Sequence, residues 1–142
     1  NHGDFAEIIF DKHHVSIGAF LLAKKCIPNL YTVSDSIGVS GLKDGHYTFA
    51  GAEIEKKDGK VCQNKNNTLA GSIVTMYQTF LNLIEIKCPL TEAVSLTSYN
   101  AAKYLDETSI GEIHPGKIAN IVILDKTLKI KSIYLHGHKI DN

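Results

Sequence analysis

A strand, a helix and a second strand follow one another at the start of this sequence, and that order restricts the chain to few folds. The apolar run Phe5–Phe10 predicts a buried strand, and the apolar positions of Ser16–Lys25 predict a helix with one buried face. Leu30–Ser34 predicts the next strand. Strand, helix and strand in this order form the unit of a parallel sheet, so the sequence indicates an α/β fold.

The rest of the chain combines an antiparallel segment, helices and terminal strands. Residues from Tyr47 to Cys62 alternate apolar and polar around the turn signal Asp58-Gly59, which predicts an antiparallel excursion. Helical spacing predicts a helix within Thr68–Glu85 and another that begins near Pro89. Further strands are expected at 118–124, 129–135 and 138–140.

The parallel part of this layout is incomplete. Two parallel strands are too few to close a barrel or to form a stable sheet. Asn1 is not an initiator methionine. We therefore expect the missing strands to precede Asn1.

Composition excludes several classes of protein. With 142 residues, 44% of them hydrophobic and 21% charged, the chain is expected to bury a core. Its 15 basic and 15 acidic residues balance, which argues against a nucleic-acid surface. No apolar run approaches the roughly 18 residues that span a membrane. The three cysteines form no CxxC pair and indicate thiols in a reducing cytoplasm.

Two polar side chains follow the two predicted parallel strands. Asp35 comes directly after the second strand, where α/β barrels place catalytic groups, and a carboxylate there can act as a general base. The alternative is a turn former or a cap. His14 follows the first strand in the same way, although the adjacent His13 leaves the choice between them open. If the strands are neighbours, both side chains face one pocket; the alternative is a structural histidine.

Small residues form a third candidate feature, Thr68-Leu69-Ala70-Gly71-Ser72. At the start of the predicted helix, such residues let a ligand approach the backbone amides that point outward. The alternative is a simple cap in which Ala70 and Gly71 allow close packing.

Several motifs of the chain resemble one family of hydrolases. They are Asp11-Lys12-His13-His14-Val15, Tyr31–Ser36, Gly41–Gly45 with Tyr47, Thr68–Ser72 followed by Thr75-Met76, Glu92-Ala93-Val94, Asn100-Ala101-Ala102, and Gly111–Lys117 with Ala119-Asn120 and Asp125. In this order they resemble the N-acetylglucosamine-6-phosphate deacetylase family of amidohydrolases. The last group is common to many amidohydrolases, whereas Thr68–Ser72 together with His14 and Asp35 is specific. The resemblance covers essentially the whole chain but only the later part of a family member.

The resemblance implies a fold and a division into domains. The fold is the C-terminal part of a (β/α)₈ TIM barrel of the metal-dependent hydrolases, with strands of a small β-sandwich domain. Residues 1–112 would belong to the barrel, with a β-hairpin insertion near 46–63, and residues 113–142 to the β-sandwich.

The resemblance also implies an activity in amino-sugar catabolism. The acetamide of N-acetylglucosamine 6-phosphate would be hydrolysed to glucosamine 6-phosphate and acetate. Asp35 would be the catalytic acid/base, which takes a proton from metal-activated water and later protonates the departing amine. His14 would bind substrate and help to polarise the amide carbonyl, and Ala70, Gly71 and Ser72 would line the sugar site.

The resemblance further implies a metal that this chain does not hold by itself. A divalent ion of the zinc or iron class is expected in the complete enzyme, with a glutamate and two histidines before Asn1 as its ligands. We therefore expect the chain alone neither to bind the metal tightly nor to turn over substrate. Family members are commonly homodimers, so the partners expected are a phosphosugar and a second subunit, with neither nucleic acid nor membrane.

Departures from the family pattern affect the shape of the pocket and leave Asp35 and His14 in place. Lys12 stands where glycine is usual, Ser34 where threonine is usual, and Ser36-Ile37 replaces a pair of small residues. Two alternatives remain open. A related amidohydrolase such as a cyclic amidase would keep Asp35 but would not need Thr68–Ser72. A non-catalytic half-barrel module would tolerate Asp35→Asn without loss of activity.

Overall fold

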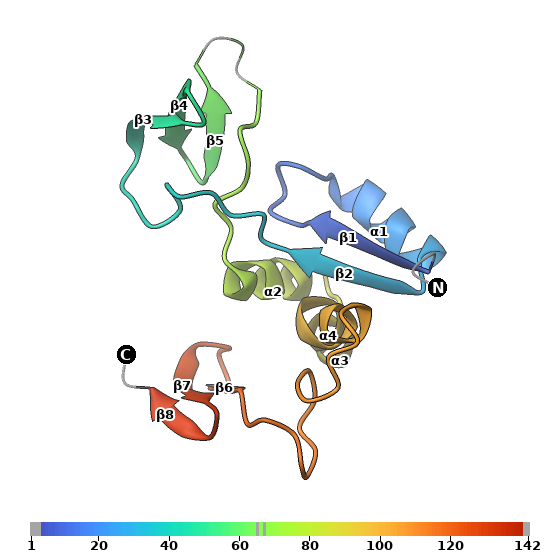
Figure 1. Ribbon diagram of the computed structural model, residues 1–142. Helices are drawn as coiled ribbons and strands as arrows, with labels where there is room; N and C mark the ends of the chain where they lie inside the picture. The colour runs from blue at the N-terminus through green and yellow to red at the C-terminus, as the bar shows by residue number, and fades with distance from the viewer. Residues whose placement is uncertain (1–3, 65, 67, 141–142) are drawn as a thin grey trace.

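The parallel strands lie between two antiparallel sheets in the computed structural model, which describes residues 4–64, 66 and 68–140 (Figure 1). β1 (Phe5–Ile9) and β2 (Asn29–Val33) pair in parallel, and α1 (Ile17–Cys26) connects them. Ser16 caps α1, since its hydroxyl accepts a hydrogen bond from the Ala19 amide at 3.2 Å. The predicted strand–helix–strand unit is confirmed. Asn1, before which further strands are expected, lies outside the described residues.

Two three-stranded antiparallel sheets flank this unit (Figure 1). The first contains β3 (Gly45–Phe49), β4 (Ala52–Lys57) and β5 (Lys60–Gln63), and the second contains β6 (Ile121–Leu124), β7 (Ile130–Leu135) and β8 (His138–Ile140). Asp58 and Gly59 form the turn between β4 and β5, with positive φ angles of 50° and 78°. The antiparallel excursion and the terminal strands are confirmed, whereas their assignment to a barrel and a β-sandwich domain remains a prediction.

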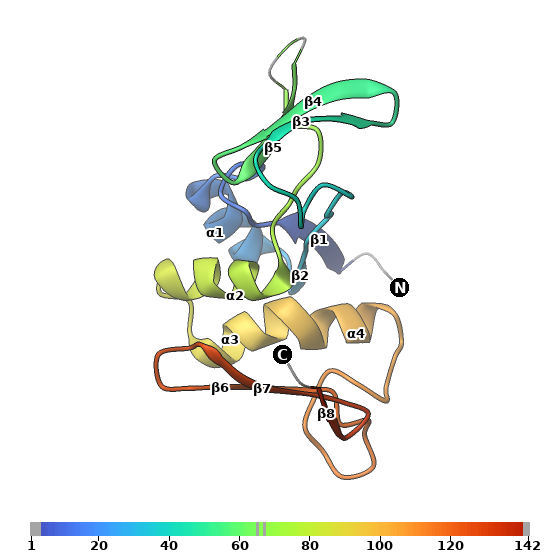
Figure 2. The ribbon, with the colours of Figure 1, turned by 90° about the vertical axis from the view of Figure 1, so that its left-hand side faces the viewer.

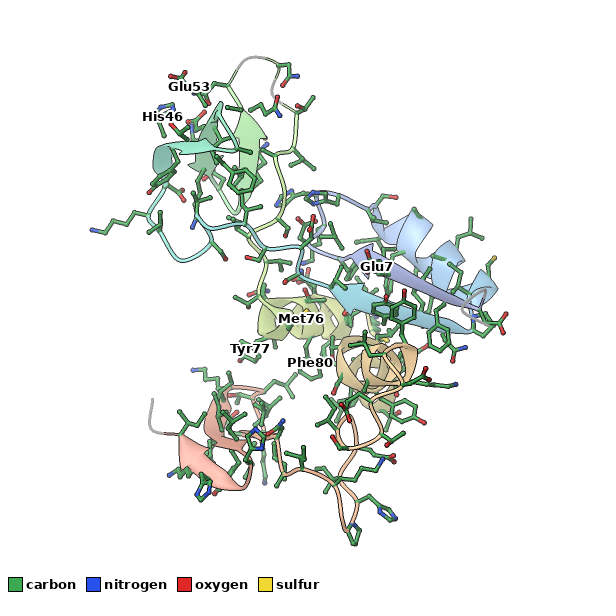
Figure 3. The ribbon with its side chains drawn as sticks, viewed as in Figure 1. Glu7, His46, Glu53, Met76, Tyr77 and Phe80 are labelled. Carbon is green, nitrogen blue, oxygen red and sulfur yellow. The ribbon has the colours of Figure 1, made fainter. Side chains whose placement is uncertain are left out.

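The helices that follow β5 lie between the parallel strands and the C-terminal sheet (Figure 2). α2 (Met76–Glu85) is followed by α3 (Leu90–Val94), a π-helical segment (Ser95–Tyr99) and α4 (Asn100–Tyr104). The Tyr77 hydroxyl on α2 donates to the Leu128 carbonyl at 2.8 Å, which ties the helix to the β6–β7 connection (Figure 3). Among the described residues, no helix is both long and apolar enough to cross a membrane.

The segment before α2 is extended rather than helical. The helix begins at Met76, because the Thr75 hydroxyl accepts from the Gln78 amide at 3.1 Å and caps it. Residues 68–72 instead form isolated bridges, Leu69 with Cys62 and Ser72 with Ser36. The prediction that Thr68–Ser72 starts a helix is therefore wrong, although the wider segment does contain one.

Two apolar clusters hold these elements together. The larger one joins α1, the parallel strands and the helices, and its buried members are Phe10, Phe20, Leu30, Phe80, Leu83, Cys88, Ala93 and Leu96. Within it the rings of Phe10 and Phe20 stack with centroids 4.2 Å apart. The smaller cluster, Val39, Ile54 and Val61, joins the β3–β5 sheet to the loop after β2. Both loops that follow β1 and β2 are thus anchored by buried side chains.

A buried hydroxyl in α2 provides a test of this packing. Thr79 is fully buried, and its Oγ1 pairs with no described residue. Thr79→Val removes an unpaired polar atom with little change of shape, so we expect the free energy of unfolding to rise by about 1 kcal/mol. Urea denaturation followed by circular dichroism measures the change.

The same substitution at Thr32 is the matched control. The Thr32 side chain is also buried, but its hydroxyl donates to the Leu96 carbonyl at 3.1 Å. Thr32→Val is therefore expected to lower the free energy of unfolding by about 1 kcal/mol, because it removes the donor from a buried carbonyl. A destabilised Thr79→Val variant would contradict the prediction.

Candidate active site

A pocket lies at the carboxyl ends of the two parallel strands. It has a volume of about 440 Å³ and is lined by Glu7, Ile8, Ile9, His14, Val15, Val33 and Asp35. Because parallel strands end at the same edge of a sheet, His14 after β1 and Asp35 after β2 both reach it. The expectation that these two side chains share one cavity is met.

A second pocket, of about 460 Å³, lies on the β3–β5 sheet and is lined by His46, Tyr47, Thr48, Glu53 and Asn64. Figure 3 shows His46 and Glu53 at the outer side of that sheet, far from Glu7 on β1. Among the residues that the structure describes, no parallel strand ends at this second pocket, so we place the candidate site at the first pocket.

The backbone at Asp35 is strained and is held from both sides. Asp35 has φ of +43°, in the left-handed region, which costs a non-glycine residue on the order of 1 kcal/mol. Its carbonyl accepts a hydrogen bond from the Ser72 amide at 3.2 Å, and the Ile37 amide donates to the Ser72 carbonyl at 3.0 Å. The residue itself is exposed. These two hydrogen bonds hold the strand end in place while the carboxylate stays accessible from the pocket.

His14 is held by the carboxylate of Asp11. His14 Nδ1 lies 2.8 Å from Asp11 Oδ2, and the amides of His13 and His14 both donate to Asp11 Oδ1 at 2.9 Å. Burial by itself raises the pKa of Asp11. The hydrogen bonds from these two amides and from the His14 ring together lower the pKa by more than burial raises it, so the pKa lies below its ordinary value. His14 lines the pocket, whereas His13 is exposed and is not among the lining residues, so we keep His14 as the candidate histidine.

Ala70, Gly71 and Ser72 lie on the segment beside Asp35 but are not among the residues that line the pocket. Ser72 is only 1% exposed; its hydroxyl accepts from the Val74 amide at 3.1 Å and donates to Asp11 Oδ2 at 3.4 Å. Ala70 packs against the smaller apolar cluster. Their role in lining the sugar site stays a prediction.

Comparison with known proteins identifies the family of the chain. The sequence profile of the Amidohydrolase family matches residues 11–140. The chain belongs to the amidohydrolase family. It is 31% identical over 134 residues to a putative N-acetylgalactosamine-6-phosphate deacetylase of Escherichia coli K12, which covers 92% of this chain and 80% of that protein. It is 34% identical over 126 residues to the N-acetylglucosamine-6-phosphate deacetylase of Lysinibacillus sphaericus, covering 87% of this chain and 32% of that protein.

Solved structures agree with this assignment. The crystal structure of N-acetylglucosamine-6-phosphate deacetylase from Pasteurella multocida matches with a TM-score of 0.90 and 29% identity, over 97% of this chain and 37% of that chain. The predicted α/β fold, part of an amidohydrolase TIM barrel, is confirmed. This amidohydrolase chain spans about a third of the length of the Lysinibacillus and Pasteurella proteins. The resemblance to amino-sugar-phosphate deacetylases is confirmed as well.

The substitution at Lys12 leaves the turn before His14 intact. Lys12 has φ of +69°, a left-handed conformation that glycine adopts without cost and that explains the usual glycine. Its ammonium pairs with Glu85 on α2 at 2.5 Å. The backbone that positions His14 therefore keeps its conformation with a lysine at this point.

The described residues do not supply a metal site by themselves. Amidohydrolases are metal-dependent as a superfamily. Within residues 4–64, 66 and 68–140, however, no group of three or more histidine, cysteine, aspartate or glutamate side chains is placed to hold a metal ion. A catalytic divalent ion takes about three protein ligands.

Two polar residues near this site, Asp11 and Glu7, carry no predicted role. Asp11 accepts amides two and three residues later, the pattern of an Asx turn, and this spacing was the available signal. Glu7 lines the pocket and accepts a hydrogen bond from the Tyr31 hydroxyl at 3.3 Å. Burial and the nearby Glu7 carboxylate raise the pKa of Tyr31. A single glutamate within an apolar strand gives no comparable signal.

Gly71 is the position in this segment where a side chain does not fit. It has φ of +102°, and a Cβ there would lie 2.6 Å from Ile37 Cγ2. We expect Gly71→Ala to lower the free energy of unfolding by about 2 kcal/mol, because it combines backbone strain with a steric clash. Urea denaturation of the two proteins measures the difference.

Gly116→Ala separates these two causes. Gly116 has a similar φ of +89°, but a Cβ there would meet nothing within 4 Å. The free energy of unfolding of Gly116→Ala is therefore expected to fall by only about 1 kcal/mol, from backbone strain alone. Equal losses at both positions would show that the contact with Ile37 has no effect.

Proposed function

We propose that this chain supplies the catalytic carboxylate of an amino-sugar 6-phosphate deacetylase. The complete enzyme would hydrolyse the acetamide of N-acetylglucosamine 6-phosphate to glucosamine 6-phosphate and acetate. The observation that carries the proposal is the shared pocket of Asp35 and His14 at the carboxyl ends of β1 and β2. The names of the Lysinibacillus and Pasteurella proteins support the same reaction, and the Escherichia coli K12 relative is named for deacetylation of the galacto epimer.

Asp35 is the acid/base in this proposal. Its exposed carboxylate accepts a proton from water as the water oxygen bonds to the acetamide carbon. It then delivers that proton to the sugar nitrogen as the carbon–nitrogen bond breaks, so that the free amine and acetic acid leave, and the acid then ionises to acetate. The hydrogen bonds that hold its backbone keep the carboxylate in position for both transfers.

His14 and the Ala70–Ser72 segment bind the substrate in this proposal. The imidazole contacts the acetamide from the other side of the pocket, and the small residues allow the sugar to approach the backbone. A divalent ion of the zinc or iron class, when bound in the complete enzyme, would lower the pKa of the attacking water and polarise the carbonyl. The ligands of that ion are expected outside the described residues.

We propose the gluco substrate over its galacto epimer. The Pasteurella structure with a TM-score of 0.90 is named for N-acetylglucosamine 6-phosphate, whereas the Escherichia coli K12 relative is named for N-acetylgalactosamine 6-phosphate. The two sugars differ in the direction of one hydroxyl. Both phosphosugars therefore belong in the assay.

We further propose a cytoplasmic homodimer with neither nucleic acid nor membrane as a partner. The free thiols of Cys26, Cys62 and Cys88 support a reducing compartment. The balance of acidic and basic residues supports a small-molecule substrate over nucleic acid. The dimer rests on the family resemblance alone, and light scattering of the complete enzyme tests it.

The decisive assay uses a chimera in which this chain replaces the matching 37% of the Pasteurella multocida enzyme. We expect acetate release from N-acetylglucosamine 6-phosphate, less from the galacto epimer, and none from the isolated 142-residue chain. Hydrolysis of a cyclic amide such as a hydantoin, without deacetylation, would favour the cyclic amidase alternative. Turnover by the isolated chain would refute the expected need for groups outside it.

A further inference from the structure

Asp11 holds the His14 ring at the edge of the pocket, and both oxygens of its carboxylate take part in hydrogen bonds. Its side chain is 6% exposed. Four donors converge on it: the His13 and His14 amides on Oδ1, and the His14 ring and the Ser72 hydroxyl on Oδ2. We propose that Asp11 is a positioning residue that holds a proton on His14 Nδ1 and thereby makes Nε2 the nitrogen offered to a ligand. The role of that ligand rests on the proposed function.

The chemistry of the contact fixes the direction of the hydrogen bond. Backbone amides only donate, so Asp11 Oδ1 is an acceptor for His13 and His14. The pKa of Asp11, below its ordinary value, keeps the carboxyl group ionised at neutral pH. An ionised carboxylate has no proton to give, so the 2.8 Å contact requires the proton on His14 Nδ1.

This assignment determines what His14 can do in the pocket. With Nδ1 engaged by Asp11, a neutral ring presents Nε2 as a hydrogen-bond acceptor, suited to an amide N–H or a hydroxyl of a ligand. His14 can donate to a carbonyl oxygen only as the imidazolium, with Asp11 as its counterion. The polarisation of the acetamide carbonyl by His14 would therefore require the charged pair.

The same carboxylate also connects His14 to the strand end of Asp35. The Ser72 hydroxyl donates to Asp11 Oδ2 at 3.4 Å, and the Ser72 amide donates to the Asp35 carbonyl at 3.2 Å. Ser72 is itself buried, and its contact with Asp11 is partly buried. Asp11 thus links the His14 ring to Ser72, and Ser72 in turn contacts the backbone of Asp35. A residue that positions two functional groups relative to each other is expected to make such contacts.

Asp11→Asn distinguishes positioning from a purely structural turn. The Asn carbonyl can still accept both backbone amides, so the turn is retained. The carboxamide NH₂ then takes the place of Oδ2 and faces His14 Nδ1, which must become an acceptor. The variant should therefore move the proton of the neutral ring from Nδ1 to Nε2, whereas a merely structural Asp11 would leave the tautomer unchanged.

The measurement is a two-bond ¹H–¹⁵N correlation of the imidazole rings in the ¹⁵N-labelled 142-residue chain at alkaline pH. We expect a protonated Nδ1 for His14 in the wild type and exchanged nitrogen signals in Asp11→Asn. His13→Gln assigns the neighbouring ring. Asp44→Asn is the matched control, since the exposed Asp44 carboxylate also accepts a backbone amide, that of Asp58 at 3.2 Å, and should leave His14 unchanged.

Two outcomes overturn the inference: an Nε2–H tautomer in the wild type, or the same tautomer in the wild type and in Asp11→Asn. If the Asp11→Asn chain loses its circular dichroism signal and does not fold, the ¹H–¹⁵N spectrum of the wild type still shows which nitrogen of His14 carries the proton. No substrate is involved, so the result is independent of deacetylation. A chimera without deacetylase activity would contradict the proposed function but would not affect the tautomer assignment.

Discussion

Asp35→Asn is expected to lower kcat/KM for acetate release by about 10²–10⁴-fold in the chimera with the Pasteurella multocida enzyme, because a positioned general acid–base contributes about that factor. The amide has the shape of the carboxylate but cannot accept the proton of the attacking water. The decrease should appear equally in kcat and kcat/KM, with KM nearly unchanged, because Asp35 transfers protons in the transition state and does not bind the sugar in the ground state.

Asp44→Asn serves as the control for this activity measurement. Asp44 is an exposed carboxylate in the loop that also follows β2, but it does not line the pocket. The activity of the Asp44→Asn chimera should stay within about twofold of that of the wild-type chimera, because substitutions of exposed residues away from a site have small effects. Full activity in Asp35→Asn would exclude the acid/base role and would favour the non-catalytic half-barrel alternative.

The position of Asp35 and His14 could be predicted because it depends on local signals. Phe5–Phe10 and Leu30–Ser34 are short apolar runs, and a helix between them forces a parallel pairing. Parallel pairing then brings both strand ends to one edge, whatever the rest of the chain does. The pocket at the ends of β1 and β2 follows from this order of elements.

The conformation of Thr68–Ser72 could not be predicted, because distant partners determine it. Leu69 and Ile73 follow helical spacing. The Ala70 amide nevertheless donates a hydrogen bond to the Val61 carbonyl at 2.9 Å, and the segment is extended. Gly71, with φ of +102°, is also incompatible with a helix. Tertiary hydrogen bonds outweigh the weak preference of an apolar spacing.

Lys56 illustrates a second limit of the sequence, since its partners are carbonyls rather than side chains. It is 7% exposed, although lysine is rarely buried. Its ammonium donates to the carbonyls of Val39, Ser40 and Leu42 at 3.1, 2.7 and 2.5 Å. All three donors of the ammonium are thereby used. The contacts tie the β3–β5 sheet to the loop that continues from Asp35.

Lys56→Met is therefore expected to lower the free energy of unfolding by about 3 kcal/mol, because hydrogen bonds from a charged donor are lost and the carbonyls they served remain partly buried. Methionine keeps the length and apolar stem of the side chain, so lost packing contributes little. Urea denaturation measures the loss, and faster hydrogen exchange at the amides of Ser40 and Leu42 should accompany it.

The neighbouring Lys57→Met is the matched control, because Lys57 is exposed on the same strand. Its effect should stay within about 0.5 kcal/mol, and the exchange rates in the loop should not change. If both variants lost the same stability, the carbonyl contacts of Lys56 would contribute nothing, and the loop after Asp35 would have to be held by its apolar residues alone. A loss confined to Lys56→Met would show that a buried cation on β4 supports the backbone from which the Asp35 carboxylate enters the pocket.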